Sequence, residues 1–200
     1  MTSKYLLLAM LASAVPVSAG SYLVTINTTS VSSVAGSLFF AYGPGAPPFD
    51  LATATITNFT GGTLGAVLVT GGVGTLPGSL ALSNASPQNY QQAFTYGNSI
   101  SFKLSLTGPA LSTPSALAIG GTDLALYLLD GSDNPLLTDD PNGSIVDFSI
   151  APKTGQVTYT TFPNAGGSTV AAVVPLPEPG SLLLLLSGAG VFLYRRKSIA

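Results

Sequence analysis

The sequence predicts an all-β protein: an antiparallel, jelly-roll-like β-sandwich of about eight to ten short strands. Three observations favour this fold. Several segments alternate apolar and polar residues with a period of two, as half-buried strands do. Turn clusters separate these segments at short intervals, and the chain has 23 glycines and 15 prolines to form them. Only 7% of the 200 residues are charged, which argues against the long amphipathic helices of a helical bundle.

Four strands are expected in the first part of the body. β-branched and aromatic residues indicate strands at Tyr22–Asn27, Ser37–Tyr42 and Leu64–Thr70. Threonine at every second position indicates another strand at Leu51–Phe59. Glycine and proline between these segments supply the backbone conformations that tight turns need.

The later part of the body continues the pattern. In Ser99–Thr107 the apolar residues occupy every even position, so this strand should be buried on one face only. Thr122–Asp130 is more uniformly apolar and should lie deeper. Ile145–Ile150 and Gln156–Phe162 are expected to form a hairpin. The one place with any helical character is Ser86–Ala93, where a single turn is expected.

The first 19 residues are typical of a secretory signal peptide. Lys4 precedes an apolar run, Tyr5–Val15, which is too short for an ordinary membrane span. Small residues before the expected cleavage site place the cut between Ala19 and Gly20, where signal peptidase would act. The predicted β-sandwich domain then covers residues 20–172.

The last 28 residues contain three segments in a fixed order. A proline-rich linker at 173–181 contains Pro177, Glu178 and Pro179, and an apolar segment expected to be helical follows at 182–194. Thirteen helical residues span about 20 Å, less than the roughly 30 Å of a hydrocarbon core. The basic tail at 195–200 begins with a cationic triplet, which would keep it on the cytoplasmic side of a membrane. The triplet is Arg195, Arg196 and Lys197.

This arrangement resembles the PEP-CTERM sorting domain of Gram-negative bacteria. The resemblance implies recognition by exosortase, a membrane-embedded protease or transpeptidase, with processing near Pro177-Glu178-Pro179. It also implies that the apolar helix holds the chain in the membrane only transiently, and that the body ends at the cell surface or outside the cell. The body is similar to a group of short PEP-CTERM proteins for which no activity is established. Ala54–Gly62, Phe102–Pro109 and Leu126–Asp130 carry that similarity.

Composition excludes several classes of function. The chain has no histidine and no cysteine, so zinc sites of those ligands, thiolate catalysis and Ser–His catalysis are excluded. Between Gly20 and Val174 there are two lysines against seven aspartates, a net charge of −5. Nucleic-acid binding needs clustered basic residues, which this region lacks. The sequence therefore predicts a protein that is not an enzyme and does not bind nucleic acid.

An aspartate-rich stretch is the one candidate metal site, for calcium. Its oxygen ligands begin at Asp130 with the spacing of a calcium loop, but Pro135 and Pro141 stand where an EF-hand needs glycine and glutamate. A calcium site formed by two adjacent loops and a pair of hydrogen-bonded Asx turns both remain open. The candidate ligands are Asp130, Ser132, Asp133, Asn134, Asp139 and Asp140.

A second candidate site is a polar and aromatic patch for glycans. β-Sandwiches often use aromatic rings as sugar platforms, although tryptophan, the largest aromatic, is absent here. The candidate residues are Tyr90, Gln91, Gln92 and Tyr96. The expected function is an exported surface or matrix protein with a structural role in biofilm, exopolysaccharide being a possible partner. The alternative is a carbohydrate- or calcium-dependent binding module.

Overall fold

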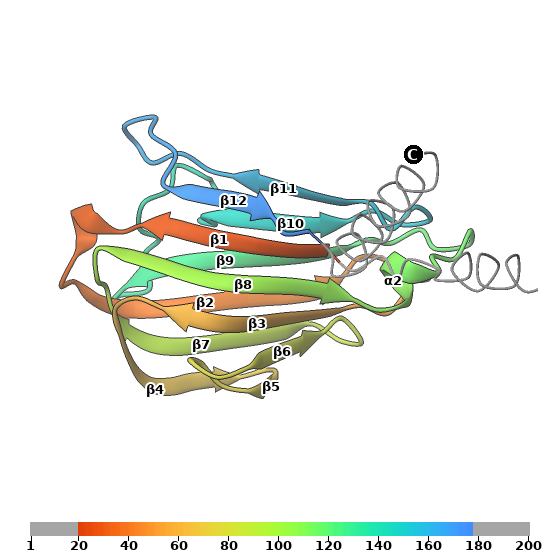
Figure 1. Cartoon of the computed structure of the whole chain (residues 1–200), viewed down its shortest axis with the longest axis horizontal. Helices are drawn as coiled ribbons and strands as arrows, with labels where there is room; N and C mark the ends of the chain where they lie inside the picture. Colours follow the sequence, from red (N-terminus) through yellow and green to blue (C-terminus); the bar gives the residue numbers. More distant parts are fainter. Residues whose placement is uncertain (1–19, 178–200) are drawn as a thin grey trace, which may run out of the picture. The chain divides into compact units, whose positions relative to one another are not determined.

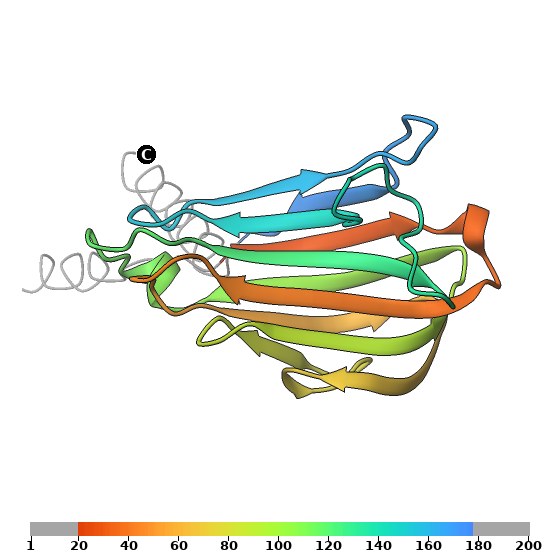
Figure 2. The ribbon, with the colours of Figure 1, turned by 180° about the vertical axis from the view of Figure 1, so that it is seen from behind.

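The computed structural model describes residues 20–177, and these form two antiparallel β-sheets of six strands each (Figures 1 and 2). The β1 sheet has the order β12 (Ala171–Pro175), β1 (Gly20–Asn27), β8 (Ser99–Thr107), β3 (Thr53–Thr60), β6 (Leu80–Ser83) and β5 (Val73–Gly74). The β2 sheet has the order β11 (Val157–Thr161), β10 (Val146–Ile150), β9 (Thr122–Asp130), β2 (Ala35–Pro44), β7 (Gln88–Thr95) and β4 (Thr63–Thr70). The short helices η2 (Thr29–Val31) and α2 (Pro109–Ser112) lie in the connections.

The two sheets pack face to face around one apolar core. Phe40 of β2 and Phe102 of β8 meet edge to face with ring centroids 5.8 Å apart, and Phe59 of β3 meets Phe94 of β7 at 5.9 Å. Each pair joins one sheet to the other, and all four rings are buried. The all-β, sandwich-like fold expected from the alternating pattern is therefore confirmed at this level.

Two of the predicted strands have their predicted limits, and the others are shifted by a few residues. β8 and β9 begin and end where the sequence placed them, at Ser99–Thr107 and Thr122–Asp130. The expected hairpin is formed by β10 and β11, closed by a hydrogen bond from the Ala151 N–H to the Gln156 carbonyl. The described residues form twelve strands. Four of them, β5, β6, β7 and β12, were not predicted from the sequence.

The helical turn expected at Ser86–Ala93 is wrong, because these residues belong mostly to β7. Side chains at alternate positions of this strand, Tyr90, Gln92 and Phe94, point into the core and are buried. Glutamine has little intrinsic preference for strands, so pairing with both β2 and β4 overrides the local preference here.

The sheet continues into the segment expected to be a proline-rich linker. β12 extends to Pro175 and pairs with β1, so that Tyr22 lies opposite Pro175. The Leu176 N–H then donates to the Ser21 carbonyl at 2.7 Å. Pro175 fits because an edge strand does not use every backbone N–H for pairing. Residues 173–175 are therefore part of the sandwich, not of a linker.

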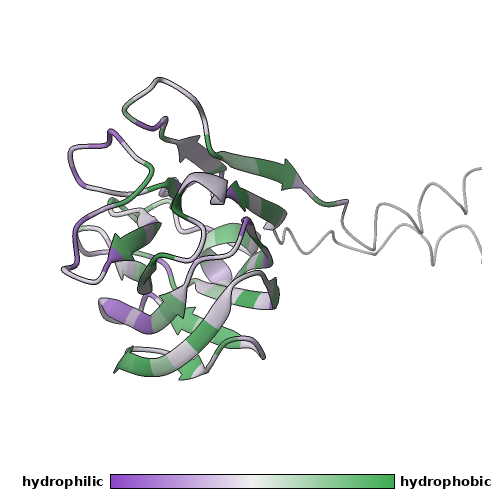
Figure 3. Cartoon of the chain, turned by 90° about the vertical axis from the view of Figure 1, so that its left-hand side faces the viewer, coloured by the Kyte–Doolittle hydropathy of each residue, from purple (hydrophilic) through white to green (hydrophobic). Residues whose placement is uncertain are grey.

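The sandwich has two ends of different character. The terminal end contains Gly20, Pro177 and the loops 45–52, 108–121 and 151–156 (Figure 1). The opposite end, here called the acidic end, contains the loop 131–144 between β9 and β10. Figure 3 faces the acidic end and shows hydrophilic residues in its loops.

Asn84 ties the two sheets together at the terminal end. It follows β6 and is fully buried. Its Oδ1 accepts the Ala52 N–H at 2.7 Å, while its Nδ2 donates to the Asp50 carbonyl at 2.8 Å and to the Thr122 Oγ1 at 2.6 Å. Since Ala52 precedes β3 and Thr122 begins β9, one amide joins a loop of the β1 sheet to a strand of the β2 sheet.

Candidate functional site

The first half of the candidate calcium stretch is an Asx turn at the acidic end. The Asp130 Oδ1 accepts the backbone N–H of Ser132 at 2.8 Å and that of Asn134 at 2.9 Å. The Asn134 side chain also donates to the Asp130 Oδ2 at 3.0 Å. The bonds from Asn134, followed by the bond from Ser132, lower the pKa of Asp130. This carboxylate is thus occupied in closing its own turn.

The second half of the stretch is organised in the same way around Asp140. Its Oδ2 accepts both the backbone N–H and the hydroxyl of Ser144, at 2.9 and 2.8 Å. Burial has the largest single effect and acts to raise the pKa of Asp140, but the bonds from Ser144 and from the backbone N–H groups of Asn142 and Gly143 together lower it. Asp133 instead accepts the side-chain amide of Gln91 at 3.0 Å, and Asp139 donates its backbone N–H to the Pro163 carbonyl.

Across residues 20–177 the structure brings no three acidic side chains into a group that could hold a metal ion. The six candidate ligands share one end of the molecule, yet the carboxylates of Asp130 and Asp140 close two separate turns and that of Asp133 bonds Gln91 of β7. Hydrogen-bonded turns, one of the two interpretations left open by the sequence, account for this stretch.

The candidate glycan patch is wrong for three of its four residues, because their side chains point into the core. Tyr90, Gln92 and Tyr96 are 1%, 4% and 2% exposed. The Tyr90 hydroxyl donates to the Gln92 Oε1 at 2.6 Å. The Tyr96 hydroxyl lies within hydrogen-bond distance of two carbonyls, those of Ser37 at 2.7 Å and Leu129 at 2.9 Å. A sugar has no access to these rings, so they serve packing.

The fourth residue of the patch, Gln91, lies on the outer face of the β2 sheet in a different aromatic setting. It pairs across the sheet with Phe39 of β2, which pairs with Tyr127 of β9. These three residues form what we call the aromatic row. Phe39 and Tyr127 are half-buried, with ring centroids 5.3 Å apart, and the Gln91 Nε2 donates to the Ser37 Oγ at 2.9 Å. The row therefore presents aromatic and polar groups on one outer surface.

Sequence reasoning missed Phe39 and Tyr127 as site candidates. The alternation in Ser37–Tyr42 already placed Phe39 on the face opposite Leu38 and Phe40. An outward-facing aromatic in a predicted strand was the available signal. Its pairing with Tyr127 depends on β2 and β9 being neighbours, which local sequence does not encode.

Asp147 of β10 is the most unusual carboxylate of the β2 sheet. Its Oδ1 is buried without a hydrogen-bond partner among the described residues. Burial raises the pKa of Asp147, and the negative charges of Asp140 and Asp123 raise it further. The Asp123 carboxylate itself accepts the Ser149 hydroxyl at 2.5 Å. This arrangement disfavours the charged form of Asp147, but among the described residues it provides no paired acid and base.

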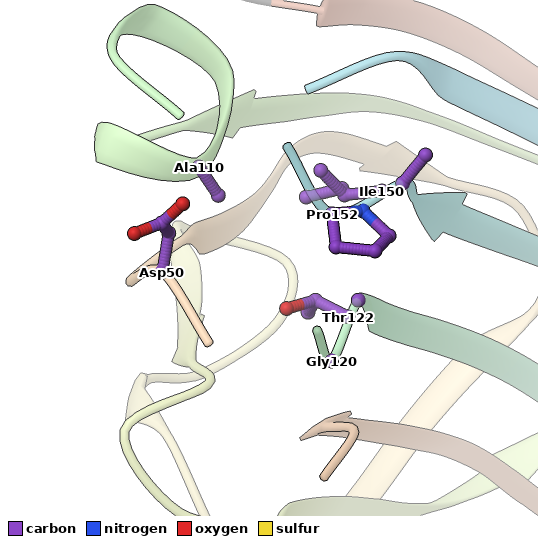
Figure 4. A pocket seen from close by; sticks show the side chains of 8 residues that line it. Asp50, Ala110, Gly120, Thr122, Ile150 and Pro152 are labelled. Carbon is purple, nitrogen blue, oxygen red and sulfur yellow. The ribbon is translucent and has the colours of Figure 1, made fainter. Parts of the chain in front are cut away.

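A small pocket opens at the terminal end, between the loops that precede β3 and β9 and the one that follows β10 (Figure 4). It encloses about 190 Å³, part of it open to solvent, which is less than the roughly 300–1,000 Å³ of ordinary ligand sites. Its polar side chains, Asp50 and Thr122, are already engaged: Asp50 accepts the Ser115 N–H at 2.7 Å and Thr122 accepts from Asn84. The pocket therefore offers little to a small molecule.

Of the predicted sorting and cleavage residues, the structure describes only Gly20 and Pro177. Gly20 begins β1, and Pro177 is exposed two residues after β12 ends. Ala19, Glu178, Pro179, Arg195, Arg196 and Lys197 lie outside the described residues, as do the expected signal peptide and C-terminal helix. Within residues 20–177 no helix has the length and apolar character needed to cross a bilayer.

Comparison with known proteins gives no match: no family model, no curated protein and no solved structure is significantly similar to this chain.

Proposed function

We propose that the chain is an exported, non-enzymatic protein of the cell surface or extracellular matrix, sorted by a PEP-CTERM/exosortase system. The proposal rests first on the sequence: an N-terminal apolar segment of signal-peptide type, and the Pro177-Glu178-Pro179 triplet followed by an apolar segment and a basic tail. In this interpretation signal peptidase and exosortase process a Gram-negative bacterial precursor, and the sandwich is the part that remains outside.

The observation that best supports this proposal is the exposed position of Pro177, the first residue of the triplet, just beyond the last described strand. β1 starts at Gly20, and the last described backbone bond to the sheet comes from Leu176, one residue before the triplet. Removal of residues 1–19 and 178–200 would therefore leave all twelve described strands intact. A processing enzyme needs a site that it can reach, and the exposed Pro177 meets this requirement.

Intact-mass measurement of the protein from native cells and medium tests the proposal. We expect a mature chain that begins at Gly20 and ends near the triplet, with or without an added group at the new C-terminus. Glu178→Ala should leave the chain unprocessed and bound to membranes. Pro175→Ala is the matched control, because it changes a neighbouring exposed proline but keeps the triplet, and it should be processed normally. Extracellular protein that still ends at Ala200 would refute the proposal.

The proposed absence of catalysis is supported by the side chains available. The chain has no histidine or cysteine, and the aspartates with the clearest hydrogen bonds, Asp130 and Asp140, hold their own turns. Asp147 lies beside other acidic residues, and the chain has no histidine to act as a base near neutral pH.

We also propose that the sandwich is a jelly roll at the level of topology. Strand pairs β1/β8, β2/β7 and β3/β6 are nested, as in a long hairpin rolled on itself. The innermost pair departs from this scheme, since β5 pairs with β6 and not with β4.

A second candidate function, carbohydrate binding, is favoured by the aromatic row. Two adjacent half-exposed rings with a neighbouring amide are groups that sugars stack on and hydrogen-bond to. Binding to the exopolysaccharide of the native cell should fall several-fold in Tyr127→Ala and persist in Tyr127→Phe, which retains the ring. Equal binding by both variants, or none by the unmodified protein, would remove this candidate.

A further inference from the structure

Exposed apolar side chains gather at the terminal end of the sandwich. Leu117 and Ile119, between α2 and β9, are 79% and 60% exposed, and Leu51, just before β3, is 51% exposed. The two loops are joined by backbone bonds: the Ile119 N–H donates to the Pro48 carbonyl at 2.8 Å, and the Ala110 N–H donates to the Leu51 carbonyl at 3.0 Å. The three apolar side chains therefore project from loops that support each other at one end, and we call them the apolar tip.

The chain leaves the fold at this same end, in both directions. Gly20 lies opposite Leu106, close to the end of β8, and Leu176 is bonded to Ser21. Only four residues, 178–181, separate the described fold from the apolar segment 182–194. At about 3.5 Å per residue, that tether reaches at most roughly 18 Å. A membrane that holds the apolar segment thus also holds the terminal end of the sandwich close to its surface.

The charges favour the same orientation. The acidic end contains Asp130, Asp133, Asp139 and Asp140, the densest group of negative charge in the described chain. At the terminal end lie one described cation, the exposed Lys153, and two carboxylates. Asp50 is hydrogen-bonded to a backbone N–H, and Asp123 is the exposed second residue of β9. An anionic lipid surface therefore repels the acidic end, with four carboxylates, more strongly than the terminal end, where Lys153 offsets one of two.

We infer that the apolar tip inserts into the surface of the lipid bilayer while the C-terminal segment is still attached, so that the sandwich stands on the membrane with its acidic end outward. The inference rests on the proposed function, since it requires segment 182–194 to be in the membrane. Leu51, Leu117 and Ile119 would contact the boundary between headgroups and acyl chains, where apolar side chains on a folded domain are stable.

Single cysteines provide the test, because the chain has none of its own. The full chain is reconstituted into vesicles of phosphatidylethanolamine and phosphatidylglycerol, and each cysteine carries an environment-sensitive fluorophore. The variants are Leu117→Cys at the apolar tip, Ser132→Cys at the acidic end as the matched exposed control, and Leu186→Cys in the apolar segment. Quenching by lipids that carry a nitroxide at headgroup depth reports contact with the bilayer.

We expect strong quenching at positions 117 and 186, and several-fold weaker quenching at position 132. Quenching at 186 but not at 117 would overturn the inference and leave the proposed function intact. No quenching at 186 would count against the membrane segment, and so against the proposed function itself. A blue shift at 117 without lipid quenching would show that a second copy or another part of the chain covers the tip, which also overturns the inference.

A second measurement separates insertion from mere proximity. In Leu117→Ser/Ile119→Ser with the fluorophore at Leu51→Cys, quenching should fall several-fold, because two inserted side chains are lost. Both replaced residues are exposed, so the fold should be unaffected, which circular dichroism would verify. Unchanged quenching at position 51 would refute insertion.

Discussion

Replacement of Asn84 by alanine should destabilise the sandwich by about 3 kcal/mol, since it removes three buried hydrogen bonds that each contribute about 1 kcal/mol. The Ala52 N–H would lose its acceptor, while the Asp50 carbonyl and the Thr122 hydroxyl would each lose a donor. Domains of this size are stable by about 5–15 kcal/mol, so the loss is a large share of the total.

Urea unfolding followed by circular dichroism measures this effect. With an m-value of about 2 kcal/mol per molar, the unfolding midpoint of Asn84→Ala should fall by about 1.5 M. Asn89→Ala is the matched control, because Asn89 is exposed on β7 and its side chain makes no hydrogen bond in the described fold. The control midpoint should change little.

Asn84→Asp refines the test. The introduced carboxylate can still accept the Ala52 N–H, but it loses both donors and carries a buried charge. Its destabilisation at pH 7 should match or exceed that of Asn84→Ala. The deficit should shrink in acid, because burial raises the pKa of the introduced carboxyl and the folded state binds the proton more tightly. If Asn84→Ala cost no more than Asn89→Ala, the tie between the sheets would carry no net stability and the reasoning would be refuted.

Three further substitutions test buried polar groups by thermal or urea unfolding. Tyr96→Phe should cost about 1–2 kcal/mol, because the hydroxyl bonded to Ser37 or Leu129 is lost. Tyr42→Phe should be neutral or stabilising, because the Tyr42 hydroxyl is buried without a partner in the described structure. The opposite order of these two would contradict the hydrogen-bond assignment. Asp147 has a pKa raised by burial, so the folded state binds its proton more tightly than the unfolded state does, and stability falls as pH rises above about 3.8. Asp147→Asn should therefore melt higher than the unmodified protein at pH 7, with the difference closing near pH 3; a difference independent of pH would be evidence against a titrating carboxyl.

Strands with regular alternation could be predicted from the sequence because their local pattern matches their final environment. β8 has an apolar residue at every second position and is buried on that face alone. β7 was not predicted, because Gln92 is polar yet buried. The Gln92 side chain accepts a hydrogen bond from the Tyr90 hydroxyl and donates one to the Gly65 carbonyl of β4. Gly65 is 27 residues away and becomes a neighbour of Gln92 only in the assembled sheet, so the local sequence does not contain this information.

The candidate site residues also fall into two groups: those that the local sequence could place and those that depend on sheet packing. The turn at Asp130 could be anticipated, since its partners are two and four residues away in the sequence. Tyr90 and Tyr96 were misassigned because aromatic residues suit both a core and a sugar platform, and only sheet packing distinguishes the two. The contact between Phe39 and Tyr127 joins strands nearly ninety residues apart and needs the strand order before it can be seen.

The pairing of β1 with β12 has a consequence for biogenesis. The chain emerges from the ribosome with its N-terminal end first, so the first strand must wait for nearly the whole polypeptide before its outer neighbour exists. Until then its free backbone groups form an open template for a strand of another molecule. A chain interrupted after Pro163 lacks β12, keeps that template permanently and should oligomerise by strand exchange, so β12 protects β1 from pairing with other molecules.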